Sequence, residues 1–211
     1  VVSDSWSLTS IVSPTDRCEP QSNADVTIVL ANKSKNSYSA GYVIPTVIYF
    51  NSDTIVEHIV LTDSLKADTL VEYTFNSKDD MSNVGTYSLT VDIAPEHDIN
   101  LDDNSRYKKL NVWGVPRLNI GPDTIFTLEP DTILLDAGTD FITFNWYEKG
   151  ANDDYDANWV SDAQKLNVTL QGEQYIVNAA NEHGCYAPDQ QIKYYDPMIY
   201  DTVCMAADTV T

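Results

Sequence analysis

The sequence predicts an all-β protein built of two tandem antiparallel β-sandwich domains. Short runs rich in Val, Ile, Thr, Tyr and Phe recur along the chain, and Asn, Asp, Ser, Gly or Pro bound each run. The runs fall into two sets that meet near residues 114–116. No stretch has the long period of an amphipathic helix, so strands joined by turns favour antiparallel sandwiches over alternating β and α units.

The first set of runs alternates apolar and polar residues, which is the pattern of a strand with one buried face. Asn51, Ser52 and Asp53 lie between two of these runs and predict a hairpin turn, because such residues favour tight turns. The set predicts a first domain over residues 1–114. Its strands are expected at 25–30, 43–50, 54–61, 70–75, 86–93 and 107–113.

The second set of runs predicts a second domain over residues 115–195. Residues 196–211 are expected to be a linker or the start of a next repeat. The connection between the domains is short and contains Pro116, so we expect it to be stiff. A short turn of helix is an alternative to strand near residues 158–165. The strands of the second domain are expected at 123–126, 131–138, 144–147, 166–170 and 172–179.

The composition predicts packed cores and an acidic surface. Of the 211 residues, 43% are hydrophobic, and the formal net charge is −20. A surface this acidic repels nucleic acid and anionic lipid, so neither is expected as a main partner. The charge attracts Ca²⁺ or basic partners, or it only keeps an extracellular protein soluble. No apolar run approaches the ~18 residues that span a membrane, so no direct membrane insertion is expected.

The histidines and cysteines predict no catalytic machinery. His183 lies close to Cys185, but a catalytic pair needs a base that a third group orients, which neighbours in one tight turn rarely achieve. The sequence contains no Gly-rich phosphate loop and no His-Glu-x-x-His or Cys-x-x-Cys metal motif. The sequence therefore predicts that the protein is not an enzyme.

One acidic loop is a candidate calcium site. Asp154, Asp156 and Asn158 have the alternating spacing of the first ligands in a Ca²⁺-binding loop, although the turn Gly and distal Glu of an EF-hand are absent. A second acidic cluster lies at residues 98–103. For both clusters the alternative interpretation is a solvated acidic turn.

Aromatic residues beside the first acidic loop are candidates for ligand binding. Tyr147, Tyr155 and Trp159 lie close to it in the sequence. Exposed aromatic rings near polar groups mark binding patches, and here the ligand would be a carbohydrate or a protein. The alternative is that these rings only cover the ends of a sheet.

Four motifs follow one another in the second domain. They are a Leu-Asp-Ala-Gly turn, a strand ending in Trp, a Gly-to-Val strand containing Tyr, and an Asn-x-x-Gly-Cys turn. These motifs stand at residues 135–138, 144–146, 172–177 and 181–185. In this order they resemble the immunoglobulin-like repeats of giant surface proteins from gliding bacteria. The resemblance implies an immunoglobulin-like sandwich, in which a mid-strand Trp fills the core and a Tyr fixes a corner.

The first domain carries a different pattern, at residues 7–14, Cys18, 26–34, 85–87 and 98–104. This pattern is similar to the adhesion-related module called a CARDB-like domain. Such modules alternate with immunoglobulin-like ones in proteins exported by the type IX secretion route. The resemblance implies an extracellular location on the outer cell surface.

The same resemblance implies a non-catalytic structural repeat of a long surface filament or adhesin that serves adhesion, gliding or prey capture. The expected partners are neighbouring repeats of the same chain, and the filament is also a candidate homo-oligomer. The alternative is a carbohydrate- or protein-binding module of a secreted protein, with a cell-surface glycan or protein as its partner.

The cysteines depart from the pattern of the family. The resemblance implies a Cys soon after the start of the immunoglobulin-like repeat, but residues 127–130 contain none. We hypothesise that Cys185 instead forms a disulfide with Cys204 and that Cys18 pairs upstream of this segment. A loop of this size would stabilise the chain by about 3 kcal/mol. The alternative is that the cysteines are free, buried thiols.

An Asp-Ser/Thr-apolar pattern occurs seven times in the chain. It resembles an O-glycosylation signal used on exported proteins of the same bacterial group, which implies glycans that solubilise and shield an extended fibre. The alternative is that Asp ends a turn and Thr suits the strand that follows. The candidate acceptors are Thr54, Ser64, Thr69, Thr124, Thr132, Thr202 and Thr209.

Overall fold

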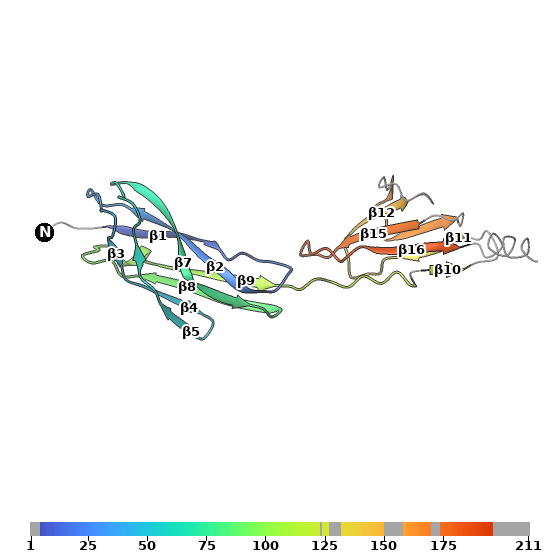
Figure 1. Cartoon of the computed structure of the whole chain (residues 1–211), viewed down its shortest axis with the longest axis horizontal. Coiled ribbons are helices and arrows are strands. Elements are labelled where there is room, and N and C mark those ends of the chain that lie inside the picture. Colours follow the sequence, from blue (N-terminus) through green and yellow to red (C-terminus); the bar gives the residue numbers. More distant parts are fainter. Residues whose placement is uncertain (1–4, 123, 127–131, 150–157, 170–173, 196–211) are drawn as a thin grey trace, which may run out of the picture. The chain divides into compact units, whose positions relative to one another are not determined.

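The chain is all-β and divides into two compact units. Unit 1 is Val1–Gly114 and unit 2 is Val115–Thr211. The computed structural model describes residues 5–122, 124–126, 132–149, 158–169 and 174–195. Over these residues every regular element is a β-strand, apart from one 3₁₀ turn at Leu101–Asp103 (Figure 1). The predicted class of all-β antiparallel sandwiches is confirmed.

Unit 1 is a sandwich of two main sheets. Its strands are β1 (Trp6–Ser13), β2 (Gln21–Asn32), β3 (Val43–Ile44), β4 (Thr46–Phe50), β5 (Asp53–Val56), β6 (Ile59–Val60), β7 (Thr69–Met81), β8 (Gly85–Ile93) and β9 (Ser105–Val112). One sheet has the order β1-β2-β7 and the other β5-β4-β8-β9, with antiparallel neighbours throughout. A short ladder joins β3 to β6.

The core of unit 1 lies between these two sheets, because side chains along each strand point alternately into the core and away from it. On β8, Tyr87, Leu89 and Val91 are buried, while Ser88 and Thr90 between them are only partly covered. The opposite sheet contributes its own buried rows, and a Trp, Trp6, is completely buried at the start of β1. Each fully buried large apolar side chain contributes roughly 1.5–3 kcal/mol to folding, so this core dominates the stability of the unit.

A tyrosine fixes the corner between β7 and β8. The hydroxyl of Tyr87 donates to the carbonyl oxygen of Asn83 at 2.7 Å and accepts from the N–H of the same residue at 3.1 Å. Its ring stacks on Phe50, with centroids 5.4 Å apart. A Tyr near a strand start that bonds to backbone a few residues upstream is the tyrosine corner of immunoglobulin-like sandwiches.

The first and last segments of unit 1 run parallel to each other. Arg17 forms a parallel bridge with Val112, and the N–H of Arg17 donates to the carbonyl of Asn111 at 3.0 Å. Farther back along both segments, the ammonium of Lys108 donates to the carbonyl oxygens of Ile11 and Val12. The side chains of β9 therefore cover backbone acceptors on the outer edge of β1, and the chain starts and finishes this unit in the same direction.

Unit 2 has a five-stranded sheet and a two-stranded sheet. Its strands are β10 (Thr124–Phe126), β11 (Thr132–Asp136), β12 (Thr143–Lys149), β13 (Asn158–Ser161), β14 (Lys165–Thr169), β15 (Gln174–Ala180) and β16 (Gln190–Tyr195). The larger sheet has the order β10-β16-β15-β12-β13, and β11 pairs with β14. The pair of β10 and β16 is parallel, while the remaining pairs are antiparallel.

The core of unit 2 is built around Trp146 in the middle of β12. Its side chain is completely buried, and its indole N–H donates to the carbonyl of Ala163 at 2.7 Å. Val177 on the neighbouring strand lies directly opposite and is also completely buried. A buried mid-strand Trp is a feature of immunoglobulin-like sandwiches, so this element of the predicted resemblance has a physical counterpart here.

Two long predicted strands are interrupted. The run 43–50 is divided at Pro45, which has no N–H for a ladder, so β3 pairs with β6 while β4 pairs with β5 and β8. The run 54–61 is divided at Glu57 and His58, where the chain leaves the four-stranded sheet. The alternative of a helical turn near residues 158–165 is wrong, because pairing with neighbouring strands makes this segment parts of β13 and β14.

Candidate functional site

The candidate ligand residues Tyr147 and Trp159 are direct cross-strand neighbours. Tyr147 of β12 lies opposite Trp159 of β13 on one side and opposite Ile176 of β15 on the other. Tyr147 is half-buried, and 59% of the surface of Trp159 is exposed. Because their neighbour Trp146 points into the core, these residues form an aromatic row on the outer face of the sheet. Such a row can stack against a sugar ring or an apolar side chain. The third candidate, Tyr155, lies outside the described residues.

The candidate calcium loop is only partly described. Asn158 is the first residue of β13, is exposed, and pairs with Glu148 across the ladder. Asp154 and Asp156 lie outside the described residues. Over the part of the chain that the structure describes, no group of three or more His, Cys, Asp or Glu side chains is placed to hold a metal ion. Among the same residues, no helix has the length and apolar character that a membrane span requires.

The turn that carries Cys185 is held together by Asn181. The side-chain oxygen of Asn181 accepts the N–H groups of His183 and Cys185, each at 3.0 Å, and Gly184 adopts a positive φ of 75°. Cys185 is completely buried and disulfide-bonded, and Cys18 is disulfide-bonded as well. The alternative of free thiols at these two positions is therefore wrong. Cys204 lies outside the described residues, so the pairing expected for it stays a prediction.

The candidate glycosylation residues differ in how available their hydroxyl groups are. Thr54, Ser64 and Thr132 are exposed, and Thr124 is half-buried. Thr69 is also half-buried, and its hydroxyl donates to the carbonyl of Lys66 at 2.6 Å. The remaining two candidates, Thr202 and Thr209, lie outside the described residues.

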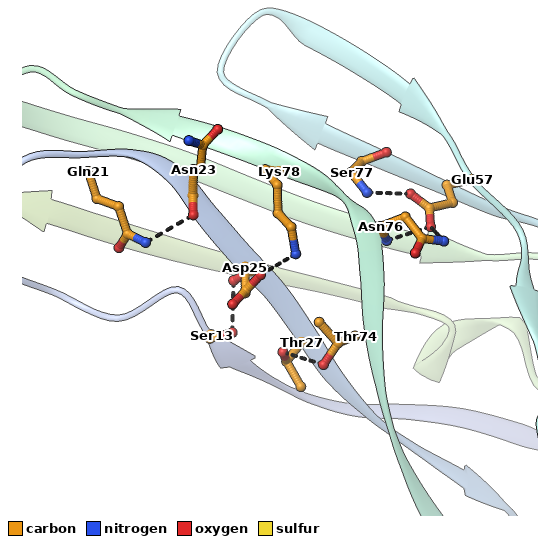
Figure 2. Close-up of polar contacts among 10 residues, drawn as sticks. All are labelled: Ser13, Gln21, Asn23, Asp25, Thr27, Glu57, Thr74, Asn76, Ser77 and Lys78. Atoms are coloured by element: carbon orange, nitrogen blue, oxygen red, sulfur yellow. Dashed lines mark hydrogen bonds and ion pairs between the residues drawn. The ribbon is translucent and has the colours of Figure 1, made fainter.

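A polar network crosses the strands β2 and β7 in unit 1 (Figure 2). The hydroxyls of Thr27 and Thr74 are 2.9 Å apart and share a hydrogen bond, and Lys78 forms an ion pair with Asp25. The hydroxyl of Ser13 on β1 donates to the carbonyl of Asp25 at 2.8 Å. These contacts join three neighbouring strands by side chains as well as by the backbone ladder.

Glu57 makes a second, separate set of polar contacts with β7. One carboxylate oxygen accepts the backbone N–H of Asn76 at 2.7 Å and the side-chain amide of Asn76 at 3.0 Å; the other accepts the N–H of Ser77 at 2.8 Å (Figure 2). Partial burial raises the pKa of Glu57, but the hydrogen bonds from Ser77 and Asn76 outweigh it and hold the pKa below its ordinary value.

Asp79 is a buried carboxyl on the same strand. Its side chain is 2% exposed, and one of its oxygens has no hydrogen-bond partner. Burial raises the pKa of Asp79 to about 6, because the charged form loses its hydration. The sequence offered one signal for this position: an Asp that falls in register with the inward-facing residues Phe75 and Met81.

The outer face of the four-stranded sheet in unit 1 carries a cross-strand row of threonines and tyrosines that was not predicted from the sequence. Thr54, Tyr49, Thr90 and Tyr107 lie opposite one another across β5, β4, β8 and β9. Tyr49 is 40% exposed and Tyr107 is 64% exposed. The strand alternation predicts which residues face outward, but only the register shows that the two tyrosines share one row.

Comparisons with solved structures found matches at low sequence identity. The CARDB domain of a Pyrococcus furiosus protein matches 54% of this chain and 98% of its own, at 14% identity and a TM-score of 0.38. The fibronectin(III)-like modules of Clostridium thermocellum CbhA match 89% of this chain and 93% of theirs, at 11% identity and a TM-score of 0.36. No family model matches this chain, and no curated protein matches it.

Proposed function

We propose that this chain is a non-catalytic structural repeat of a long extracellular surface filament or adhesin. The observation that carries the proposal is the direction of the terminal segments. In unit 1 the first segment runs parallel to β9, and in unit 2 β10 runs parallel to β16. Each unit therefore takes the chain in at one end of its sandwich and releases it at the other. Units of this kind extend a chain when they are joined in series.

Charge and edge chemistry support the same proposal. A net charge of −20 keeps an extended, exposed protein soluble. In unit 1, Lys108 covers carbonyl groups on the edge of β1 and Glu57 covers amides on the edge of β7. Sandwiches in a linear array expose many such edges, and covered edges resist unwanted pairing.

We also propose an outer-surface location, neighbouring repeats as partners, and glycosylation of this chain. The motifs that resemble type IX-secreted repeats support an outer-surface location, with neighbouring repeats as partners and a homo-oligomeric filament as the assembly. Glycans are proposed at the candidate acceptors, among which the exposed Thr54, Ser64 and Thr132 are favoured over Thr69. Calcium at Asp154, Asp156 and Asn158 is a further proposal.

The first test is the intact mass of the segment cut, without reduction, from its native source. The expected result is a mass above 23.6 kDa that increases in sugar-sized steps. Peptide mapping then locates the sugars, and the recombinant segment expressed without a glycosylation system is the control. An unmodified mass removes glycosylation. Absence of antibody labelling on intact, unpermeabilised cells contradicts the surface location.

Peptide mapping of the same unreduced sample tests the cysteines. Alkylation before reduction is expected to modify neither Cys18 nor Cys185, because both are disulfide-bonded. A linked peptide that contains Cys185 and Cys204 supports their predicted pairing. A linked peptide that joins Cys185 to any other cysteine overturns it.

A binding module is the second candidate function, and the exposure of Trp159 beside Tyr147 favours it. Binding to a glycan array or to isolated cell-surface proteins tests this candidate. If the aromatic row is the site, Trp159→Ala abolishes the signal and leaves the fold intact, because this side chain is outside the core. Val160→Ala on the same strand is the matched control. Equal binding by both variants contradicts a site at this row.

A further inference from the structure

The strand β7 contains a bulge in the middle of its ladder with β2. Asp25 pairs with Lys78 and Thr27 pairs with Thr74, so one residue of β2 lies opposite three residues of β7. Asn76 and Ser77 belong to the extra residues of β7. A bulge leaves residues without a ladder partner and bends the strand locally.

The two amides of this bulge converge on one carboxylate. In a regular strand consecutive N–H groups point in opposite directions, so a single side chain cannot accept both. Here the N–H groups of Asn76 and Ser77 reach the two oxygens of Glu57, at 2.7 and 2.8 Å (Figure 2). The side-chain amide of Asn76 adds a third donor at 3.0 Å. Together these donors form a cradle for one carboxylate.

The carboxylate comes from a different part of the sandwich. Glu57 follows β5, which is the edge of the four-stranded sheet, whereas β7 is the last strand of the three-stranded sheet. Glu57 therefore spans from one sheet to the edge of the other. Glu57 also lies at the break in the predicted strand 54–61, between the end of β5 and the start of β6.

An edge strand with free amides is a template for another strand. β7 has 13 residues and is the longest strand of the described chain. Two copies of one edge can pair antiparallel about a two-fold axis, because each copy offers the other the same donors and acceptors. The expected occupant is β7 of a second copy of this chain, because a long edge of 13 residues is complementary to its own copy.

We propose that Glu57 is a strand-edge cap. Its carboxylate occupies the bulge amides of Asn76 and Ser77 and thereby keeps the edge of β7 from pairing with β7 of a second copy. The ion pair between Lys78 and Asp25 lies next to the bulge and joins β7 to β2 on the paired side of the strand. This role is independent of whether the chain belongs to a surface filament.

The test compares Glu57→Ala with Glu72→Ala in the full chain. Glu72 is an exposed carboxylate on β7 itself, so both variants lose one negative charge and only the first uncovers the bulge. Amide hydrogen exchange at Asn76 and Ser77 and sedimentation velocity over a range of concentrations are measured. In Glu57→Ala we expect exchange at both amides to accelerate roughly tenfold or more, as for loss of a charge-assisted hydrogen bond.

Glu57→Ala is also expected to form a dimer as concentration rises, with new exchange protection along β7, while Glu72→Ala stays a monomer. Unchanged exchange at Asn76 and Ser77 overturns the cap. Accelerated exchange in a chain that stays monomeric overturns the role against pairing. Glu57→Gln guards against misfolding of the alanine variant, because it keeps the side-chain size and one acceptor. In Glu57→Gln we expect hydrogen exchange to accelerate more at the amide of Ser77 than at the amide of Asn76. Exchange that accelerates at neither amide contradicts the proposal.

Discussion

Units 1 and 2 each bury one tryptophan completely but differ in the polar groups that they bury. Trp6 in unit 1 and Trp146 in unit 2 are both inaccessible to solvent. Over the described residues, the buried polar and charged side chains all belong to unit 1, and Asp79 is the one that ionises. Two sandwiches of related architecture can therefore respond differently to pH, because among the described residues the buried carboxyl belongs to unit 1.

The largest expected effect comes from removing each tryptophan. Trp146→Ala and Trp6→Ala are each expected to destabilise their own unit by roughly 3–5 kcal/mol, because each leaves a large cavity. Hydrogen exchange of the full chain in increasing denaturant follows both units at once. Each variant is expected to lose protection in its own unit first. Simultaneous loss of exchange protection in both units would show that they unfold cooperatively, and the two units would then not differ in stability.

The next effect concerns Asp79. Its pKa is about 6 in the folded state and lies near its ordinary value of 3.8 when unfolded. Between these values the folded state retains the proton and the unfolded state does not, so the contribution of Asp79 to the stability of unit 1 falls as pH rises from about 4 to 6 and then levels off. Asp79→Asn is expected to stabilise unit 1 at pH 7 by roughly 1–2 kcal/mol and to remove this dependence.

Thermal or urea unfolding of the wild type and of Asp79→Asn from pH 4 to pH 8 measures this effect. The matched control is Asp80→Asn, because Asp80 is the exposed neighbour on the same strand. If the difference in stability between Asp79→Asn and the wild type does not grow between pH 4 and 6, with unit 1 observed separately, the assignment to Asp79 is refuted.

A smaller effect separates the two tryptophan N–H groups. The indole N–H of Trp146 donates to Ala163, while that of Trp6 is buried with no hydrogen-bond partner. Trp146→Phe leaves a carbonyl without its donor, and Trp6→Phe does not. We expect Trp146→Phe to cost about 1 kcal/mol more than Trp6→Phe. Equal losses in denaturant midpoints would indicate that the hydrogen bond makes no net contribution.

The smallest effect near neutral pH involves Asp136 in unit 2. Hydrogen bonds from Lys165, Gly138 and Gln164 lower its pKa to about 2. Because the folded pKa lies below the unfolded one, the associated stability is present above pH 4 and is lost only as pH falls from about 4 to 2. Carbon-13 chemical shifts of the Asp136 carboxyl measure its pKa. A midpoint near 4 would contradict the expected lowering.

Alternating patterns predicted the strands well, because one buried face leaves a period of two in the sequence. The run 86–93 is an example, since it lies within β8 and its inward residues are buried. The same pattern could not reveal where a strand changes sheet. Pro45 and the pair Glu57 and His58 interrupt apolar runs only briefly. Whether the strand ends at these residues depends on the strands it pairs with, which lie elsewhere in the sequence.

Candidate sites were predicted unevenly for a similar reason. Tyr147 and Trp159 were singled out because they lie near the acidic loop in the sequence, and their direct pairing required the ladder register. Glu57 gave no motif because its role depends on a bulge in β7, which only the unequal pairing with β2 makes visible. Sequence periodicity therefore locates faces, whereas contacts between distant segments define the groups that share a site.

The parallel pairing of terminal segments has a mechanical consequence. When a unit is pulled by its two ends, the bonds between β10 and β16 lie across the direction of tension and share the load at the same time. Antiparallel terminal strands would instead open one bond after another, like a zipper. The same geometry holds between Arg17 and Val112 in unit 1. In unit 2 the three paired positions of β10 and β16 are thus loaded together in shear, and in unit 1 a single parallel bridge is loaded in the same way.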